Sequence, residues 1–152
     1  MQANFKIPIS VLVVVHTPAL DVLLLERKDW PGFWQSVTGS IEHEGESLRE
    51  TAVREVREET GIDAALYRLV DWERQNRFEI FKKRLSRYAP GVTHNLEHVF
   101  GLTVPGTLPV TLAPAEHTDY LWLPWRDAAE KCLSWSNRDA ILLLPEMLAS
   151  GG

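Results

Sequence analysis

Three glutamates crowd one short segment of the sequence, Arg54-Glu55-Val56-Arg57-Glu58-Glu59. On a helix of about 3.6 residues per turn, Glu55 and Glu59 lie on or beside the apolar stripe that faces inward, and Glu58 flanks it. Acidic side chains near a helix C-terminus oppose the helix dipole by about 0.3–1 kcal/mol, and like charges one turn apart repel each other. A divalent cation would relieve both costs, and hard carboxylate oxygens suit Mg²⁺ or Mn²⁺. The segment therefore indicates a metal site, with a solvated, charged helix face as the alternative that the residue types leave open.

A helix over residues 48–60 is predicted to carry these glutamates. Ser47 and Glu50 have the spacing of a capping box, in which the serine hydroxyl accepts from the Glu50 amide and the carboxylate accepts from the Ser47 amide. Gly61 follows as a residue that adopts a left-handed conformation at low cost and so ends a helix. The helix that holds the candidate ligands thus has a defined start and a defined end.

The other predicted elements indicate an α/β fold in which helices cover a sheet. Strands are expected at residues 9–15, 22–25, 33–37, 67–72, 78–81, 98–104 and 120–123, and helices at 124–131 and 137–147. Pro145 must end or bend the last helix, because proline cannot donate a backbone hydrogen bond. With 152 residues and no linker, the chain is expected to form a single domain over residues 1–152.

Composition and missing motifs narrow the function classes. The formal net charge of −5 argues against nucleic-acid binding, which needs a cationic face, whereas a bound metal can supply local charge for a small polyphosphate substrate. No apolar run approaches the roughly 18 residues of a membrane span. Cys132 is the only cysteine and zinc spacings, P-loops and dinucleotide turns are absent. We expect a cytoplasmic protein with no nucleic acid, membrane or obligate protein partner.

The segment from Gly39 to Ile62 resembles the Nudix box, the hallmark of hydrolases that act on nucleoside diphosphates linked to another group. The matching residues are Gly39, Glu46, Arg54-Glu55-Val56-Arg57-Glu58-Glu59, Thr60, Gly61 and Ile62. Gly39 and Glu46 enclose six residues, one more than the usual spacing of the family. We interpret the difference as a one-residue insertion in the loop over residues 41–44, where extra length costs little.

The resemblance implies the Nudix fold, in which a mixed β-sheet is sandwiched between α-helices and the box forms a loop–helix–loop. It also implies Mg²⁺, with Mn²⁺ as a substitute, held by Glu55, Glu59 and an acid from a distant loop, for which we choose Glu116. Glu58 would be the catalytic residue that binds a further ion or orients water. Four residues would be structural, with Glu46 paired to Arg54: Gly39, Glu46, Arg54 and Gly61.

Stretches outside the box resemble one subgroup of this family, the bacterial dihydroneopterin triphosphate diphosphatases of folate synthesis. These stretches are residues 33–40, 78–81, 87–93 and 134–138. The resemblance implies hydrolysis of 7,8-dihydroneopterin triphosphate to the monophosphate and pyrophosphate. Basic residues would meet phosphates, aromatic residues would border the pterin, and a carboxylate would accept from its N–H groups. The predicted substrate-binding residues are Lys6, Arg27, Thr38, Phe78, Glu79, Ile80, Phe81 and Ser134.

Two other functions stay open on the sequence. A general (d)NTP pyrophosphohydrolase, acting on dATP or oxidised nucleotides, would share the metal helix and differ in its pocket. A non-catalytic Nudix-like module that senses a nucleotide is the alternative of another class, and such a module would be expected to lose the metal carboxylates. The expected ligand is therefore a small-molecule pterin or nucleoside triphosphate.

Overall fold

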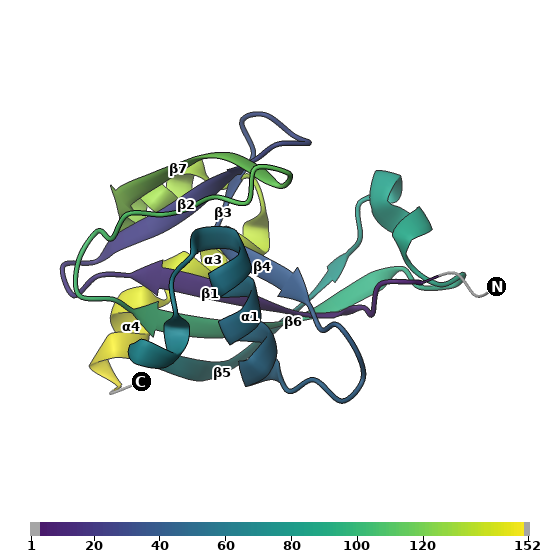
Figure 1. Ribbon diagram of the computed structural model, residues 1–152, viewed down its shortest axis with the longest axis horizontal. Helices are drawn as coiled ribbons and strands as arrows, with labels where there is room; N and C mark the ends of the chain where they lie inside the picture. Colours follow the sequence, from purple (N-terminus) through teal and green to yellow (C-terminus); the bar gives the residue numbers. More distant parts are fainter. Residues whose placement is uncertain (1–3, 151–152) are drawn as a thin grey trace.

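A seven-stranded mixed sheet lies at the centre of the computed structural model, which describes residues 4–150 (Figure 1). Its strands are β1 (Ile9–His16), β2 (Asp21–Arg27), β3 (Trp34–Gln35), β4 (Val37–Ser40), β5 (Arg68–Glu79), β6 (His94–Thr103) and β7 (His117–Pro124). The helices are α1 (Leu48–Thr60), α2 (Trp125–Lys131), α3 (Trp135–Leu142) and α4 (Leu144–Ala149), with 3₁₀ turns η1 (Ala64–Leu66) and η2 (Lys82–Arg87). The predicted α/β class is confirmed.

The sheet splays into two parts from the turn between β1 and β2. The two strands pair at His16 and Val22, next to that turn. Beyond it, β1 runs parallel to β6 and antiparallel to β4, whereas β2 pairs antiparallel with β3 and β7. Strand β5 adds to the far side of β6. Figure 1 shows the β2–β7 part diverging from the β1–β6–β5 part, so the molecule opens at the end away from the turn.

Helices cover both faces of the sheet, which explains why β1 is apolar at nearly every position. Val11 and Val13 pack in the core beneath α1, and Leu12 and Val14 pack in a second core with residues of α2, α3 and α4. All four side chains are fully buried. Because each buried valine or leucine contributes roughly 1.5–3 kcal/mol, β1 anchors both layers that bring α1 and α3 to the site.

Helix α1 has the predicted bounds and caps. The Glu50 amide donates to Ser47 Oγ at 3.1 Å, and the Ser47 amide donates to Glu50 Oε1 at 3.3 Å. Gly61 has φ +76°, and its amide donates to the Arg57 carbonyl at 2.9 Å. The predicted helix and both of its end signals are confirmed.

Four sequence predictions need correction. The strand expected at residues 33–37 is two short strands, β3 and β4, which pair with β2 and β1 respectively. The separate strands expected at 67–72 and 78–81 are one strand, β5. The residues in its middle are polar, as in a loop, but they form an exposed part of the sheet that contains a bulge. Strand β5 ends at Glu79, and Phe81 instead precedes η2. Strand β6 begins at His94, four residues before the predicted start. The sequence did not reveal this start because polar residues, Asn95 and Glu97, occupy the first inward positions of the strand. The last predicted helix divides at Leu143, and Pro145 lies in the first turn of α4, where its missing N–H costs nothing.

No helix within residues 4–150 is long and apolar enough to cross a membrane.

Removing the N-terminal cap of α1 is expected to destabilise the fold modestly. Ser47→Ala deletes the acceptor for the Glu50 amide, which should lower the free energy of unfolding by about 1 kcal/mol. Chemical denaturation followed by circular dichroism measures this difference. Ser86→Ala replaces an exposed serine of η2 and is the matched control, for which we expect a change within about 0.5 kcal/mol. Equal stabilities of the two variants would contradict the role of the cap.

Candidate active site

The open end of the splayed sheet holds a cavity of about 870 Å³. Its wall combines three chemical groups of side chains. The acids include Glu55, Glu59 and Glu116; the cations include Lys6, Arg27, Arg84 and Arg87; the uncharged or buried polar group includes Ser10, Asn95, Glu97, Ser136 and Asn137. The cavity therefore combines carboxylates suited to a cation, side chains suited to phosphate and a group of buried polar side chains.

Glu59 is the most deeply buried acid of the cavity, with 1% of its surface exposed. Neither carboxylate oxygen has a hydrogen-bond partner among residues 4–150. Burial raises the pKa of Glu59 well above its ordinary value, and the neighbouring carboxyls of Glu55 and Glu116 add to the shift. A buried carboxylate without donors costs folding free energy, so this residue requires a ligand rather than a packing explanation.

Gly39 permits the close approach of strand β4 to helix α1. A Cβ atom at position 39 would overlap with the carboxylate of Glu55. The Glu55 side chain is 12% exposed, and Arg54 Nη1 donates to its Oε1 at 2.8 Å. Burial raises the pKa of Glu55, while the contact with Arg54 opposes that shift. A glycine at this position therefore fixes where the Glu55 carboxylate enters the cavity.

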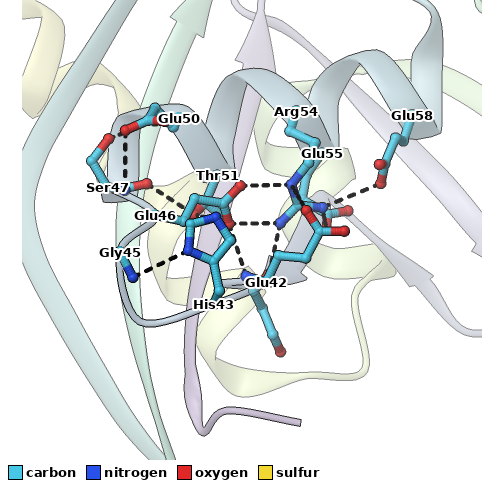
Figure 2. A network of polar contacts seen from close by, with 11 residues as sticks. Glu42, His43, Gly45, Glu46, Ser47, Glu50, Thr51, Arg54, Glu55 and Glu58 are labelled. Carbon is cyan, nitrogen blue, oxygen red and sulfur yellow. Dashed lines mark hydrogen bonds and ion pairs between the residues drawn. The ribbon is translucent and has the colours of Figure 1, made fainter. Parts of the chain in front are cut away.

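Arg54 ties the loop after β4 to helix α1 (Figure 2). Its Nε and Nη2 donate to the two carboxylate oxygens of Glu46 at 2.8 and 2.9 Å, and Nη2 also donates to the Ser40 carbonyl at 3.0 Å. The hydrogen bond from Arg54 is the main reason why the pKa of Glu46 falls to about 2. Thr51 Oγ1 donates to the same carboxylate at 2.8 Å. The extra residue of the loop is thus accommodated without loss of the Glu46–Arg54 pair.

A third acid and a histidine complete a group at this end of the cavity that could hold a metal ion, called the metal end below. Ligand atoms of Glu59, Glu116 and His117 all lie within 4.8 Å of one another. His117 is 4% exposed, and its Nε2 lies 3.7 Å from Glu59 Oε1. Burial, together with the charge of Arg27, lowers the pKa of His117 to about 4, which keeps its imidazole neutral near pH 7. Partnerless carboxylate oxygens, adjacent acids and a glycine cradle fit a divalent cation.

Glu58 lies apart from the other two glutamates of the helix. Its side chain is 54% exposed and accepts from Arg54 Nη1 at 3.3 Å. Among residues 4–150, it is absent from the cavity wall. Figure 2 shows its carboxylate directed at Arg54, farther along α1 than Glu55. Its catalytic role therefore stays a prediction, whereas Glu55, Glu59 and Glu116 are brought together at one end of the cavity.

All eight predicted substrate-binding residues line the cavity. Arg27 Nε contacts Asp29 at 2.9 Å, and the same carboxylate accepts from Arg84 Nη2 at 2.9 Å. Phe81 is 47% exposed and packs edge-on against Trp30, with ring centroids 5.3 Å apart. Glu79 is exposed, and as the next residue of β5 it projects from the opposite face to Phe78. The structure therefore gathers the predicted set, and Glu79 does not share the face that carries Phe78.

The residues of the wall that sequence reasoning missed include Arg84, Arg87, Asn95, Glu97 and His117. The basic run at 82–87 signalled the two arginines, and alternation of polar residues before Val99 signalled the two residues of β6. Burial raises the pKa of Glu97 to about 7, against hydrogen bonds from Asn76 and Ser136. No sequence pattern marks His117, because its burial depends on the pairing of β7 with β2.

Comparison with known proteins agrees with this geometry. The chain matches the NUDIX domain family over residues 6–144. It is 47% identical over 140 residues to the dihydroneopterin triphosphate diphosphatase of Escherichia coli (strain K12), covering 90% of this chain and 91% of that protein. It is 39% identical over 144 residues to the Haemophilus influenzae protein of the same name, covering 93% and 89%. The structure of the E. coli dihydroneopterin triphosphate pyrophosphohydrolase superimposes with a TM-score of 0.84 at 46% identity, covering 91% of this chain and 95% of that chain. The chain belongs to the Nudix family.

Removing the charge of Glu59 is expected to stabilise the metal-free protein, increasingly so at higher pH. The folded-state pKa of Glu59 is raised above its ordinary value of 4.5. The contribution of this residue to the free energy of unfolding is therefore complete below pH 4.5 and is lost as the pH rises through the folded-state pKa. In EDTA, E59Q should melt above the wild type, by a margin that grows between about pH 5 and pH 8. Differential scanning calorimetry measures the margin.

The control for this measurement is E130Q, which removes the charge of an exposed glutamate on α2. It is expected to melt with the wild type across the same pH range. A margin for E59Q that stays constant with pH would contradict the proposed cost of the buried charge.

Proposed function

We propose that the protein hydrolyses 7,8-dihydroneopterin triphosphate to dihydroneopterin monophosphate and pyrophosphate, as a cytoplasmic step of folate synthesis. Water is added across the anhydride bond between the α- and β-phosphates. The main support is the cavity that joins a partnerless buried carboxylate to a group of cations. The similarity to diphosphatases of this name over nine-tenths of the chain supports the choice of substrate.

Glu55, Glu59 and Glu116 would hold Mg²⁺, or Mn²⁺ as a substitute. When bound, a divalent ion neutralises phosphate charge and makes water more acidic. Because the imidazole of His117 is neutral near pH 7, this residue adds no positive charge beside the acids that would compete with the cation. Arg54 orients Glu55 by a hydrogen bond and, through Glu46, holds the loop against the helix.

The cations of the wall would bind and orient the triphosphate. Arg27 and Arg84 share Asp29, which fixes two guanidinium groups side by side. The Lys6 amide donates to the Arg87 carbonyl at 2.8 Å, which brings two further cationic residues together. Guanidinium groups contact phosphate oxygens in pairs, so this side of the cavity suits a polyphosphate chain.

Glu58 would accept the proton of the attacking water. For this role its side chain would have to leave Arg54 and turn towards the cavity, and an exposed contact of 3.3 Å offers little resistance to that rotation. A carboxylate then needs hydrogen-bond reach to the water.

A general (d)NTP pyrophosphohydrolase is the second candidate, because it would use the same metal end and the same cations. A sensor module is disfavoured, because Glu55, Glu58 and Glu59 are all retained.

Glu59→Gln is expected to lower kcat by roughly a thousandfold, since loss of one charged ligand removes several kcal/mol of stabilisation of the transition state. Pyrophosphate release with Mg²⁺ measures this, with an EDTA sample as the blank. E130Q should retain wild-type turnover, and circular dichroism should show both variants folded. Turnover of E59Q near the wild-type rate would refute the ligand assignment.

The wild-type protein is expected to prefer 7,8-dihydroneopterin triphosphate over dATP, dGTP and 8-oxo-dGTP by at least about tenfold in kcat/KM, because polar groups built for one ring are left unpaired by another. Steady-state kinetics across the four substrates give the ratios. A higher kcat/KM for any of the purine nucleotides would favour the second candidate.

A further inference from the structure

Two polar residues of β6 line the cavity and serve neither the metal end nor the cation group. Glu97 is 3% exposed and Asn95 is 2% exposed. They are two positions apart in one strand, so their side chains project from the same face. Val99, the next residue on that face, packs in the core with residues of α3. Glu97 and Asn95 therefore extend this face into the α3 side of the cavity.

Glu97 accepts from the neutral side chains of Asn76 and Ser136, whereas the hydrogen bonds of Asn95 are incomplete. Asn76 Nδ2 donates to Glu97 Oε1 at 3.4 Å, a long contact. Asn95 Nδ2 donates to Ser10 Oγ at 2.7 Å, but Asn95 Oδ1 has no partner among the described residues. Whichever way the amide is turned, one of its two polar atoms stays free. Buried polar groups in such a state are uncommon without a ligand.

The neighbouring side chains suit a flat ring. Phe78 lies directly opposite Asn95 in the pairing of β5 with β6, and Asn76 lies opposite Glu97, so all four share one face. Ser134 and Trp135 line the cavity at the start of α3. An aromatic surface beside a buried carboxylate is the arrangement that a heterocycle with adjacent N–H donors requires.

The cavity connects these residues with the acids of α1. Ser10 and Glu97 share the face of β1 and β6 that packs against α3, whereas Glu55 belongs to the helix on the other face. Because Glu97 and Glu55 line one cavity, a ligand with a ring at one end and phosphates at the other would contact both.

We propose that Glu97 recognises the 2-amino-4-oxopyrimidine edge of the substrate, accepting from its ring N–H and its 2-amino group through both carboxylate oxygens, with Asn95 as a second polar contact to the ring. This specificity-determining role rests on the proposed hydrolysis of a pterin triphosphate. It moves the pterin contact from Glu79, on the other face of β5, to Glu97. Adenine lacks this pair of adjacent donors, whereas guanine shares it with pterins.

The test is E97Q, which keeps the size of the side chain and replaces one acceptor by a donor. We expect KM for 7,8-dihydroneopterin triphosphate to rise roughly 10- to 100-fold with kcat within about twofold, because a paired charge-assisted contact is lost in ground and transition states alike. For dATP, whose adenine lacks this pair of adjacent donors, KM should rise less than for 7,8-dihydroneopterin triphosphate. E130Q is the matched control and should retain wild-type KM for both substrates.

Two outcomes would overturn the proposal. One is an unchanged KM in folded E97Q, and the other is a raised KM in E79Q alone. Wild-type protein provides a second measurement that needs no variant. In titrations followed by the quenching of tryptophan fluorescence, the Kd of neopterin should be at least tenfold lower than that of the matching 2-oxo pteridine. The 2-oxo group of that compound would face the carboxylate. Equal affinities would also refute the contact.

These results separate the inference from the proposed function. If the wild type prefers dGTP and E97Q loses that preference, recognition of the edge stands and the pterin substrate is wrong. If the wild type prefers the pterin and E97Q behaves like the wild type, the substrate stands and the role of Glu97 is wrong.

Discussion

The bidentate contact of Arg54 with Glu46 is the interaction on which the geometry of the metal end depends. It joins the loop after β4 to the middle of α1, and the same guanidinium contacts Ser40 and Glu55. The strong pairing keeps Glu46 ionised, with its pKa near 2. The loop therefore has one preferred position, and that position brings Gly39 against the Glu55 carboxylate. The half-buried side chain of Arg54 thus connects strand β4 and the loop after it to helix α1.

The splayed sheet supplies the other half of the site. Because β1 and β2 part after the turn that joins them, the ends of β4, β5, β6 and β7 surround one cavity. Helix α1 on one face contributes acids, and the start of α3 on the other face contributes hydroxyl and amide groups. A substrate in the cavity would contact the carboxylates of α1 at one end and the polar groups near α3 at the other. In the proposed function, the helix layer with α1 therefore serves the reaction, and the layer with α3 serves the choice of substrate.

Local signals predicted α1 well because its caps and its buried stripe lie within one segment. Helical periodicity likewise placed Glu55 and Glu59 correctly at the inward side of that helix. The polar pocket was beyond such reasoning, since Glu97 and Asn95 are buried only by pairing with β1 and β5. Polar residues at the inward positions of β6 concealed the start of the strand. The sequence also could not show that Phe78 lies on the same face as Asn95 and Glu97, because this depends on the register between β5 and β6.

The buried Glu59 carboxylate makes the folded, ligand-free protein locally frustrated. Its position suits the proposed role as a cation ligand and is poor for the stability of the chain alone. Selection or engineering for thermal stability in the absence of metal would therefore tend to replace this residue first, and with it the activity. A useful diagnostic follows for the design of more robust versions: the screen for stabilising substitutions has to be run on the metal-loaded protein, where the acid contributes favourably to both properties.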